Sequence, residues 1–135
     1  MINELEKFFK ALGEPTRLRI IKLLAERELC VCELVEVLQI SQPRISQHLR
    51  VLKNAGLVSE RKEQQWSISA LHFENLGKML SMFNELLSKP LELLDEFKAE
   101  APRMRLVTNA SSAENCKNWR NSNKIIRKKQ EVANG

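Results

Sequence analysis

The chain has 135 residues, 43% apolar and 29% charged, enough for one domain with a real core and a short tail. No apolar run reaches the roughly 18–20 residues that a membrane-spanning helix needs, and the amino terminus lacks the pattern of a secretion signal, so we predict a cytoplasmic protein. Only four glycines are present, which argues against a glycine-rich phosphate loop and a turn-rich β-fold. Abundant helix formers favour a mainly α domain.

The net charge of +5 is unevenly distributed along the chain. Residues 1–100 hold 14 Lys or Arg against 15 Asp or Glu, whereas residues 101–135 hold 8 against 2. Within the first part, residues 42–62 contain five basic residues against Glu60 alone. A basic window in an otherwise acidic domain is typical of a nucleic-acid contact, although charge alone slightly favours a solvated helix face.

Apolar residues at helical spacing predict four helices before residue 57. Gly13 ends the first, and Pro15 lies in the first turn of the second, where a helix accepts proline. The fourth begins after Ser41, a good N-cap, and ends at residues 54–56. The four apolar stripes are Leu5/Phe8/Phe9/Leu12, Leu18/Ile21/Leu24/Ala25, Val31/Leu34/Val35/Leu38 and Ile45/Leu49/Leu52.

From about Leu57 to Ala70 the spacing of apolar residues changes from helical to alternating. Trp66, Ile68 and Ala70 alternate with polar residues, which is typical of a half-buried strand. Leu57 begins the partner strand, and residues 62–64 form the predicted tip. The sequence therefore predicts a short β-hairpin.

A longer helix is predicted from about Leu71 to Ser88, and a short one over residues 91–97. The longer helix has two apolar stripes, and such a helix is usually buried on both sides. We therefore expect a homodimer through this helix and the N-terminal helix. We predict one domain over residues 1–100 and a basic, disordered tail over residues 101–135, because the tail has few apolar anchors.

Two short helices joined by residues 39–41 and followed by a hairpin are typical of a winged helix-turn-helix, a mainly α fold with a small β wing. An ordinary helical hairpin with a solvated face is the alternative. Lys53 is expected to contact a phosphate, and Arg61 and Lys62 at the hairpin tip suit phosphates or the minor groove. His48 fits the DNA surface and internal packing equally well. The predicted DNA-binding residues are Ser41, Gln42, Arg44, Ser46, Gln47, His48, Arg50, Lys53, Arg61 and Lys62.

Cys30 and Cys32 flank the apolar stripe of the third helix, so core filling does not explain them. Side chains two apart on a helix point about 200° apart. One ion can bind both sulfurs only if Cys30 lies at the helix start and the first turn loosens. Glu33 in the capping-box position supports that start. A helix N-terminus also lowers a thiol pKa and favours the thiolate, which binds soft ions. The spacing alone leaves structural and redox roles equally open.

Four segments resemble the ArsR/SmtB family of winged-helix repressors. Residues 28–34, ELCVCEL, resemble the metalloid-binding box of its arsenic-responsive members, and residues 41–52, SQPRISQHLRVL, resemble its recognition helix. Residues 12–20 and 54–58 resemble the start of its second helix and the approach to its wing. The resemblance implies a homodimeric repressor that needs no cofactor to bind operator DNA. It also implies release by trivalent arsenic or antimony, bound as inducer at Cys30 and Cys32.

The chain departs from the family at two sites. Well-known members carry a further cysteine where Val35 stands, so the third ligand is Cys116, a small-molecule thiol or a hydroxide. The zinc site that some relatives carry on the long helix is not predicted, because His72 and Glu74 have no matching pair near residues 83–86.

Two rival functions use the same thiols. One is a repressor of the same fold that senses oxidants through Cys30 and Cys32. The other is a small thiol-dependent enzyme, which we disfavour because neither a phosphate loop nor strand–helix alternation accompanies the cysteines. We therefore predict no enzymatic activity.

Overall fold

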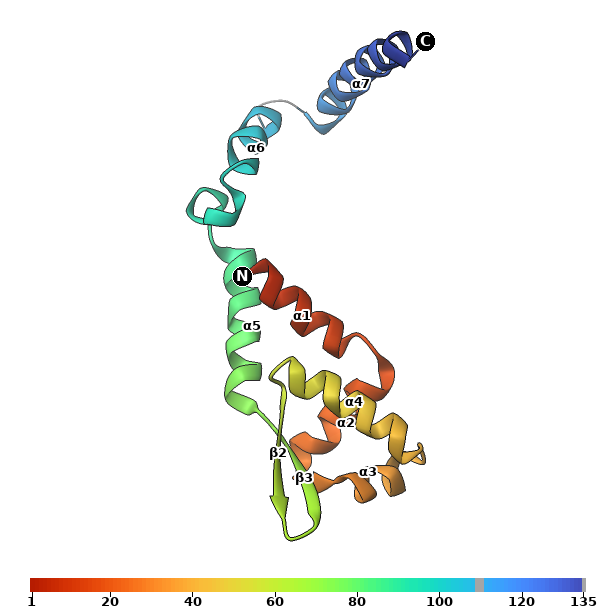
Figure 1. The fold of residues 1–135 in the computed structure, drawn as a ribbon. Helices are drawn as coiled ribbons and strands as arrows, with labels where there is room; N and C mark the ends of the chain where they lie inside the picture. The colour runs from red at the N-terminus through yellow and green to blue at the C-terminus, as the bar shows by residue number, and fades with distance from the viewer. Residues whose placement is uncertain (109–110, 135) are drawn as a thin grey trace. The chain divides into compact units, whose positions relative to one another are not determined.

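A computed structural model describes residues 1–108 and 111–134, and Figure 1 shows the course of the chain. The chain divides into two compact units, residues 1–88 and the segment from Lys89 onward. The first unit contains five helices and three strands: α1 (Ile2–Leu12), α2 (Pro15–Glu26), β1 (Leu29–Cys30), α3 (Val31–Leu38), α4 (Gln42–Asn54), β2 (Val58–Glu63), β3 (Trp66–Leu71) and α5 (Phe73–Ser88). This order confirms the winged helix-turn-helix, a mainly α fold with a small β wing.

The helix boundaries follow local signals in the sequence. Pro15 starts α2, and Glu14 caps it by accepting a hydrogen bond from the backbone N–H of Arg17 at 2.9 Å. The turn between α3 and α4 passes through Gln39, which adopts the left-handed conformation at φ 56°. Ser41 occupies the N-cap position of α4, as predicted, but its side chain makes no capping hydrogen bond.

The three strands form an antiparallel sheet in the order β1-β3-β2. The alternating pattern predicted only two strands, because the two residues of β1 are too few to show a period. The predicted hairpin tip is wrong: Glu63 still pairs with Trp66, so the turn consists of Gln64 and Gln65, with Gln64 at φ 58°. Apart from Val58 the side chains of β2 are exposed, so no apolar alternation marked how far the strand continues.

The core lies where α1–α5 meet the base of the sheet. The largest fully buried side chains are Phe8, Ile20, Leu34, Ile45, Leu52 and Leu57. Three of the predicted stripes face this core, but α2 is rotated relative to its prediction, since Ile20 is buried and Leu18 is 52% exposed. The packing of α4 on α2 and α3 fixes which face of α4 remains open.

The second unit differs from the predicted disordered tail. After two short 3-10 turns, Leu91–Leu93 and Asp95–Phe97, it contains α6 (Glu100–Thr108) and α7 (Ser112–Asn134). Apolar spacing cannot detect a helix that has few apolar residues, and the Glu, Lys and Arg residues of α7 have favourable helix propensity. The unit boundary also falls at residues 88–89, before the predicted residue 100. In the described part of the chain, no helix combines the length and apolar character needed to cross a membrane.

Candidate DNA-binding surface and thiol site

Helix α4, predicted to be the recognition helix, is held by its apolar face. Ile45, Leu49 and Leu52 are buried in the core, which turns the opposite side of the helix outward. The predicted DNA-binding residues that this places on the exposed side are Ser41, Gln42, Arg44, Gln47 and Arg50, with Ser46 half-buried beside them. These side chains are donors and acceptors suited to base edges and phosphates.

Lys53, predicted to contact a phosphate, has a partner within the chain. Its ammonium forms an ion pair with Glu60 on β2, and the Glu60 carboxylate also accepts a hydrogen bond from the Ser67 hydroxyl on β3. The C-terminal part of α4 is thereby tied to both wing strands. No local pattern in the sequence marks Glu60 as the partner of Lys53, because the two residues lie seven positions apart on different elements.

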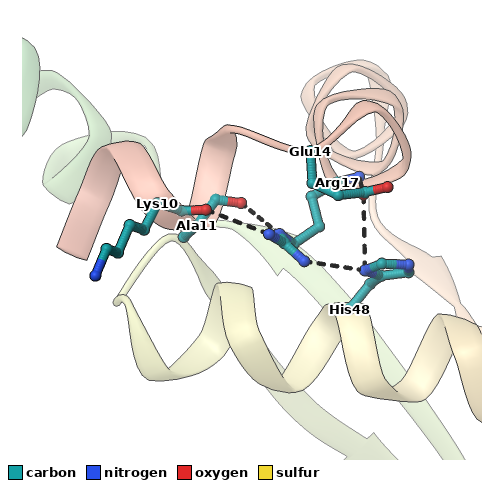
Figure 2. A network of polar contacts seen from close by, with 5 residues as sticks. All are labelled: Lys10, Ala11, Glu14, Arg17 and His48. Carbon is teal, nitrogen blue, oxygen red and sulfur yellow. Dashed lines mark hydrogen bonds and ion pairs between the residues drawn. The ribbon is translucent and has the colours of Figure 1, made fainter. Parts of the chain in front are cut away.

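Of the two roles left open for His48, the structure favours internal packing over the DNA surface. Its side chain is only 16% exposed, and its Nδ1 lies 3.3 Å from Arg17 Nη1 and 3.8 Å from a Glu14 oxygen (Figure 2). The packing of α4 on α2 decides this orientation. The backbone N–H of Arg17 is the main cause that lowers the pKa of Glu14, while burial opposes it and His48 adds to it.

Arg17 joins three helices around His48 (Figure 2). Its Nε donates to the carbonyl of Ala11 at 2.6 Å and its Nη2 to the carbonyl of Lys10 at 3.2 Å, both in the last turn of α1. These carbonyls belong to the helix end that lacks intrahelical partners. The one local signal for Arg17 in the sequence is its place three residues after the capping Glu14, and this does not predict contacts with α1 or His48.

Arg61 is corrected from the hairpin tip to the middle of the wing. It lies opposite Ile68 in the sheet and forms ion pairs with Glu28 and, at 3.3 Å, with Glu63. The hydrogen bond to Glu28 is the main cause that raises the pKa of Arg61. Lys62, one residue farther along β2, is exposed. Both side chains are exposed, but Arg61 is engaged in ion pairs within the chain.

Cys30 and Cys32 converge at the start of α3. Cys30 is the N-cap, with φ −81° and ψ 165°, and its sulfur lies 2.7 Å from that of Cys32. The prediction that Cys30 lies at the helix start is confirmed. The first turn itself is regular: the capping box is intact, and Glu33 accepts a hydrogen bond from the Cys30 N–H at 3.0 Å, so the loosening expected when an ion binds stays a prediction. The extended N-cap conformation alone brings the sulfurs together.

The expected lowering of the Cys30 pKa is wrong. Burial raises the pKa of the Cys30 thiol, and the hydrogen bond with Cys32 raises it further. The Glu33 backbone N–H acts in the opposite direction but is outweighed. The hydrogen bond from the Cys30 N–H is the main cause that lowers the pKa of Glu33, and Arg27 at 2.6 Å adds to it.

A cavity of about 410 Å³ opens beside the two sulfurs, between the start of α3 and the wing. It is lined by Glu28, Cys30, Cys32, Glu33, Arg61, Glu63, Gln64, Trp66 and Ile68. Cys116, the candidate third ligand, is an exposed residue of α7 in the second unit. Across residues 1–108 and 111–134, no three His, Cys, Asp or Glu side chains gather as a metal site. The first unit thus contributes a two-sulfur site with space beside it.

Comparisons with known proteins agree with this architecture. Residues 14–60 match the family model described as a bacterial regulatory protein of the arsR family. The HTH-type transcriptional regulator MJ1325 of Methanocaldococcus jannaschii is 43% identical over 81 residues, which cover 59% of this chain and 91% of that protein. The arsenical resistance operon repressor of Bacillus subtilis is 34% identical over 82 residues, covering 60% and 78%.

Solved structures show the same similarity. An ArsR-like transcriptional regulator from Rhodococcus sp. RHA1 superposes with a TM-score of 0.62 at 25% sequence identity. The match covers 65% of this chain and 83% of the Rhodococcus chain.

Proposed function

Because the chain belongs to the ArsR family of DNA-binding transcriptional regulators, we propose that it is a homodimeric repressor released from operator DNA by trivalent arsenic or antimony. The observation that carries this proposal is the convergence of the Cys30 and Cys32 sulfurs at 2.7 Å, at the start of a helix that supports the recognition helix. Regulation of transcription follows from the family, whereas the inducer and the dimer are the proposed parts.

The dimer is supported by an apolar face on α1 and α5. Phe9 and Phe83 pack edge to face with ring centroids 4.9 Å apart, which joins the two helices. Phe73, Leu80 and Leu87 on α5 are 63%, 51% and 69% exposed. A second copy would cover these side chains and place two recognition helices about one DNA turn apart on an inverted repeat. Light scattering at micromolar concentration tests this, and a monomer would contradict it.

The inducer is supported by the chemistry of the two thiols. Trivalent arsenic and antimony are soft ions that prefer sulfur ligands, and Cys30 and Cys32, which line the 410 Å³ cavity, would hold the ion there. A third ligand from Cys116, a small-molecule thiol or a hydroxide would complete the set. Because the pKa of Cys30 is raised, binding must displace a thiol proton, so affinity should increase with pH.

The position of Cys30 provides a route from the thiols to DNA. Its backbone pairs with Ile68 of wing strand β3, while its side chain and backbone form the capping box of α3. An ion that draws the two sulfurs into its own geometry would strain both connections. Moving a two-state equilibrium from 1:99 to 99:1 requires about 5.5 kcal/mol of differential affinity, which is within reach of two or three metal–sulfur bonds.

Oxidant sensing is the second candidate, supported by the same short distance between sulfurs. Hydrogen peroxide would oxidise the two thiols to one disulfide and be reduced to two molecules of water. The two candidate functions share the fold, the DNA surface and the two cysteines. They differ only in whether a metalloid ion binds the thiols or an oxidant reacts with them.

Titration of the DNA complex separates the candidates. Arsenite and, separately, hydrogen peroxide are added to the parent protein, to the double variant Cys30→Ser/Cys32→Ser and to Cys116→Ser. We expect arsenite to release the parent and Cys116→Ser but not the double variant, which should still bind operator DNA. A double variant released at the parent's arsenite concentration would overturn the metalloid proposal. Release by peroxide alone would favour the redox candidate.

A further inference from the structure

The DNA-reading unit carries little net positive charge. Residues 1–88 hold 12 Lys or Arg against 11 Asp or Glu, whereas the segment from residue 89 holds 10 against 6. Two basic residues of the wing region, Lys53 and Arg61, form ion pairs with Glu60 and Glu28 of the same unit. Since neutralisation of phosphates supplies most sequence-independent DNA affinity, the first unit is poorly equipped for that part of binding.

Helix α7 carries the missing charge in an ordered form. Its 23 residues extend about 34 Å, close to one turn of B-DNA. Five basic residues follow each other at intervals of three, four, three and one, which places them within an arc of about 100° on one face of the helix. All five are exposed: Lys117, Arg120, Lys124, Arg127 and Lys128. Glu131, on the same face, marks the end of this basic stripe.

We propose that α7 is a second DNA-contacting element, whose basic stripe binds backbone phosphates of duplex DNA without reading its sequence. Guanidinium and ammonium groups on a rigid helix are suited to successive phosphates. The proposal rests on DNA binding by the first unit and assigns to α7 the salt-dependent share of the affinity.

The composition of α7 favours DNA over other anionic partners. A helix that lies on a membrane needs a continuous apolar face, whereas Asn118 and Ser122 interrupt the side opposite the stripe. Single-stranded nucleic acid is usually held by several stacking aromatic side chains, whereas Trp119 is the one aromatic residue in this helix. Phosphate contact with a duplex requires neither feature.

The test measures binding of the full chain to a fluorescent random-sequence duplex of about 40 base pairs, across about 50 to 200 mM salt. Five Gln substitutions, K117Q/R120Q/K124Q/R127Q/K128Q, remove the stripe. We expect affinity to fall at least about tenfold at 100 mM salt, and the log–log salt slope to become shallower by about 0.9 for each phosphate that is no longer neutralised. Unchanged affinity and slope would overturn the proposal.

A matched variant tests whether the position of the cations on α7 matters, or only its net charge. The exchanges K117N/N118K, R120S/S122R and K128Q/Q130K together preserve the charge of α7 but move three cations off the stripe. We expect this variant to bind at least about threefold more weakly than the parent. Circular dichroism checks that its helical content is unchanged. Binding equal to the parent would mean that only net charge matters and would overturn the proposal.

Two other ligands and one control variant test which partner the stripe binds. Tighter binding of the parent to duplex RNA of equal length, or to vesicles of anionic phospholipid, would assign the stripe to that partner and overturn the proposal. An Arg44→Ala variant should lose preference for operator over random DNA while keeping the salt dependence. A parent protein that does not prefer operator over random DNA would contradict the proposed repressor function. If the parent does prefer the operator but the α7 variants bind random DNA as tightly as the parent, only the inference about α7 fails.

Discussion

Nη1 of Arg17 lies 3.3 Å from Nδ1 of His48, so a side chain at the start of α2 contacts the middle of recognition helix α4 (Figure 2). The same guanidinium also donates hydrogen bonds to the Ala11 and Lys10 carbonyls at the end of α1. One side chain therefore connects the helix proposed for dimerisation with the helix proposed to read DNA.

Arg17→Ala should lower the free energy of unfolding by about 1–3 kcal/mol, because it leaves the part-buried Ala11 carbonyl and His48 without their donor. Chemical denaturation measures this change. Arg19→Ala, which removes an exposed arginine from the same helix, is the matched control and should stay within about 0.5 kcal/mol of the parent. Equal effects of the two substitutions would show that the network contributes nothing to stability.

Base reading is expected to depend on Arg44 and Gln47. Both are exposed on α4, and replacing either with Ala should weaken operator binding by about 1–3 kcal/mol and relax base preference. His48→Ala should instead lower the stability of the fold, since His48 packs against Glu14 and Arg17. Binding assays on operator variants with single base changes measure the preference. Loss of base preference in His48→Ala, with Arg44→Ala unaffected, would reverse the assignment.

The two neighbouring cations of the wing should behave differently. Lys62→Ala should weaken binding to all DNA sequences alike and reduce the salt slope by about 0.9, the value for a single neutralised phosphate. Arg61→Ala should change the slope less, because Arg61 already pairs with Glu28 and Glu63. Anisotropy titrations at several salt concentrations compare the two. A larger change in slope for Arg61→Ala would show that the ion pairs with Glu28 and Glu63 do not keep Arg61 from the phosphates.

Cys30 should react slowly with alkylating reagents near neutral pH. Burial raises its pKa, so the midpoint of its alkylation rate should lie above the value of about 8.5 for an ordinary thiol. The variant Cys32→Ser/Cys116→Ser leaves Cys30 as the only thiol for this measurement, and the same protein unfolded in denaturant is the reference. A midpoint at or below that of the unfolded chain would contradict the prediction.

The same shift predicts how stability depends on pH. A thiol whose pKa is higher in the folded state stabilises the fold below the pKa of the unfolded thiol, and this contribution disappears as pH rises through the folded pKa. Cys30→Ser should therefore unfold with a weaker pH dependence than the parent in the alkaline range, as measured by chemical denaturation at several pH values. An equal pH dependence of the two proteins would contradict the raised pKa.

The sequence determined most features that depend on neighbours along the chain. Apolar spacing located the helices of the first unit, and Pro15, the capping box of Glu33 and the position of Cys30 defined where α2 and α3 begin. These signals are local because a helix bonds each residue to one four positions away. The exposed residues of α4, including Arg44 and Gln47, followed from the same period.

Only the tertiary structure decided which side chains are already engaged within the fold. Arg17 meets His48 across 31 residues, and Arg61 meets Glu28 across 33. It also decided that β1 pairs with β3 and that burial outweighs the helix N-terminus at Cys30, which reversed the predicted pKa direction. Contacts between distant segments depend on how helices rotate as they pack and on the register in which strands pair. The periodicity of a single helix or strand determines neither.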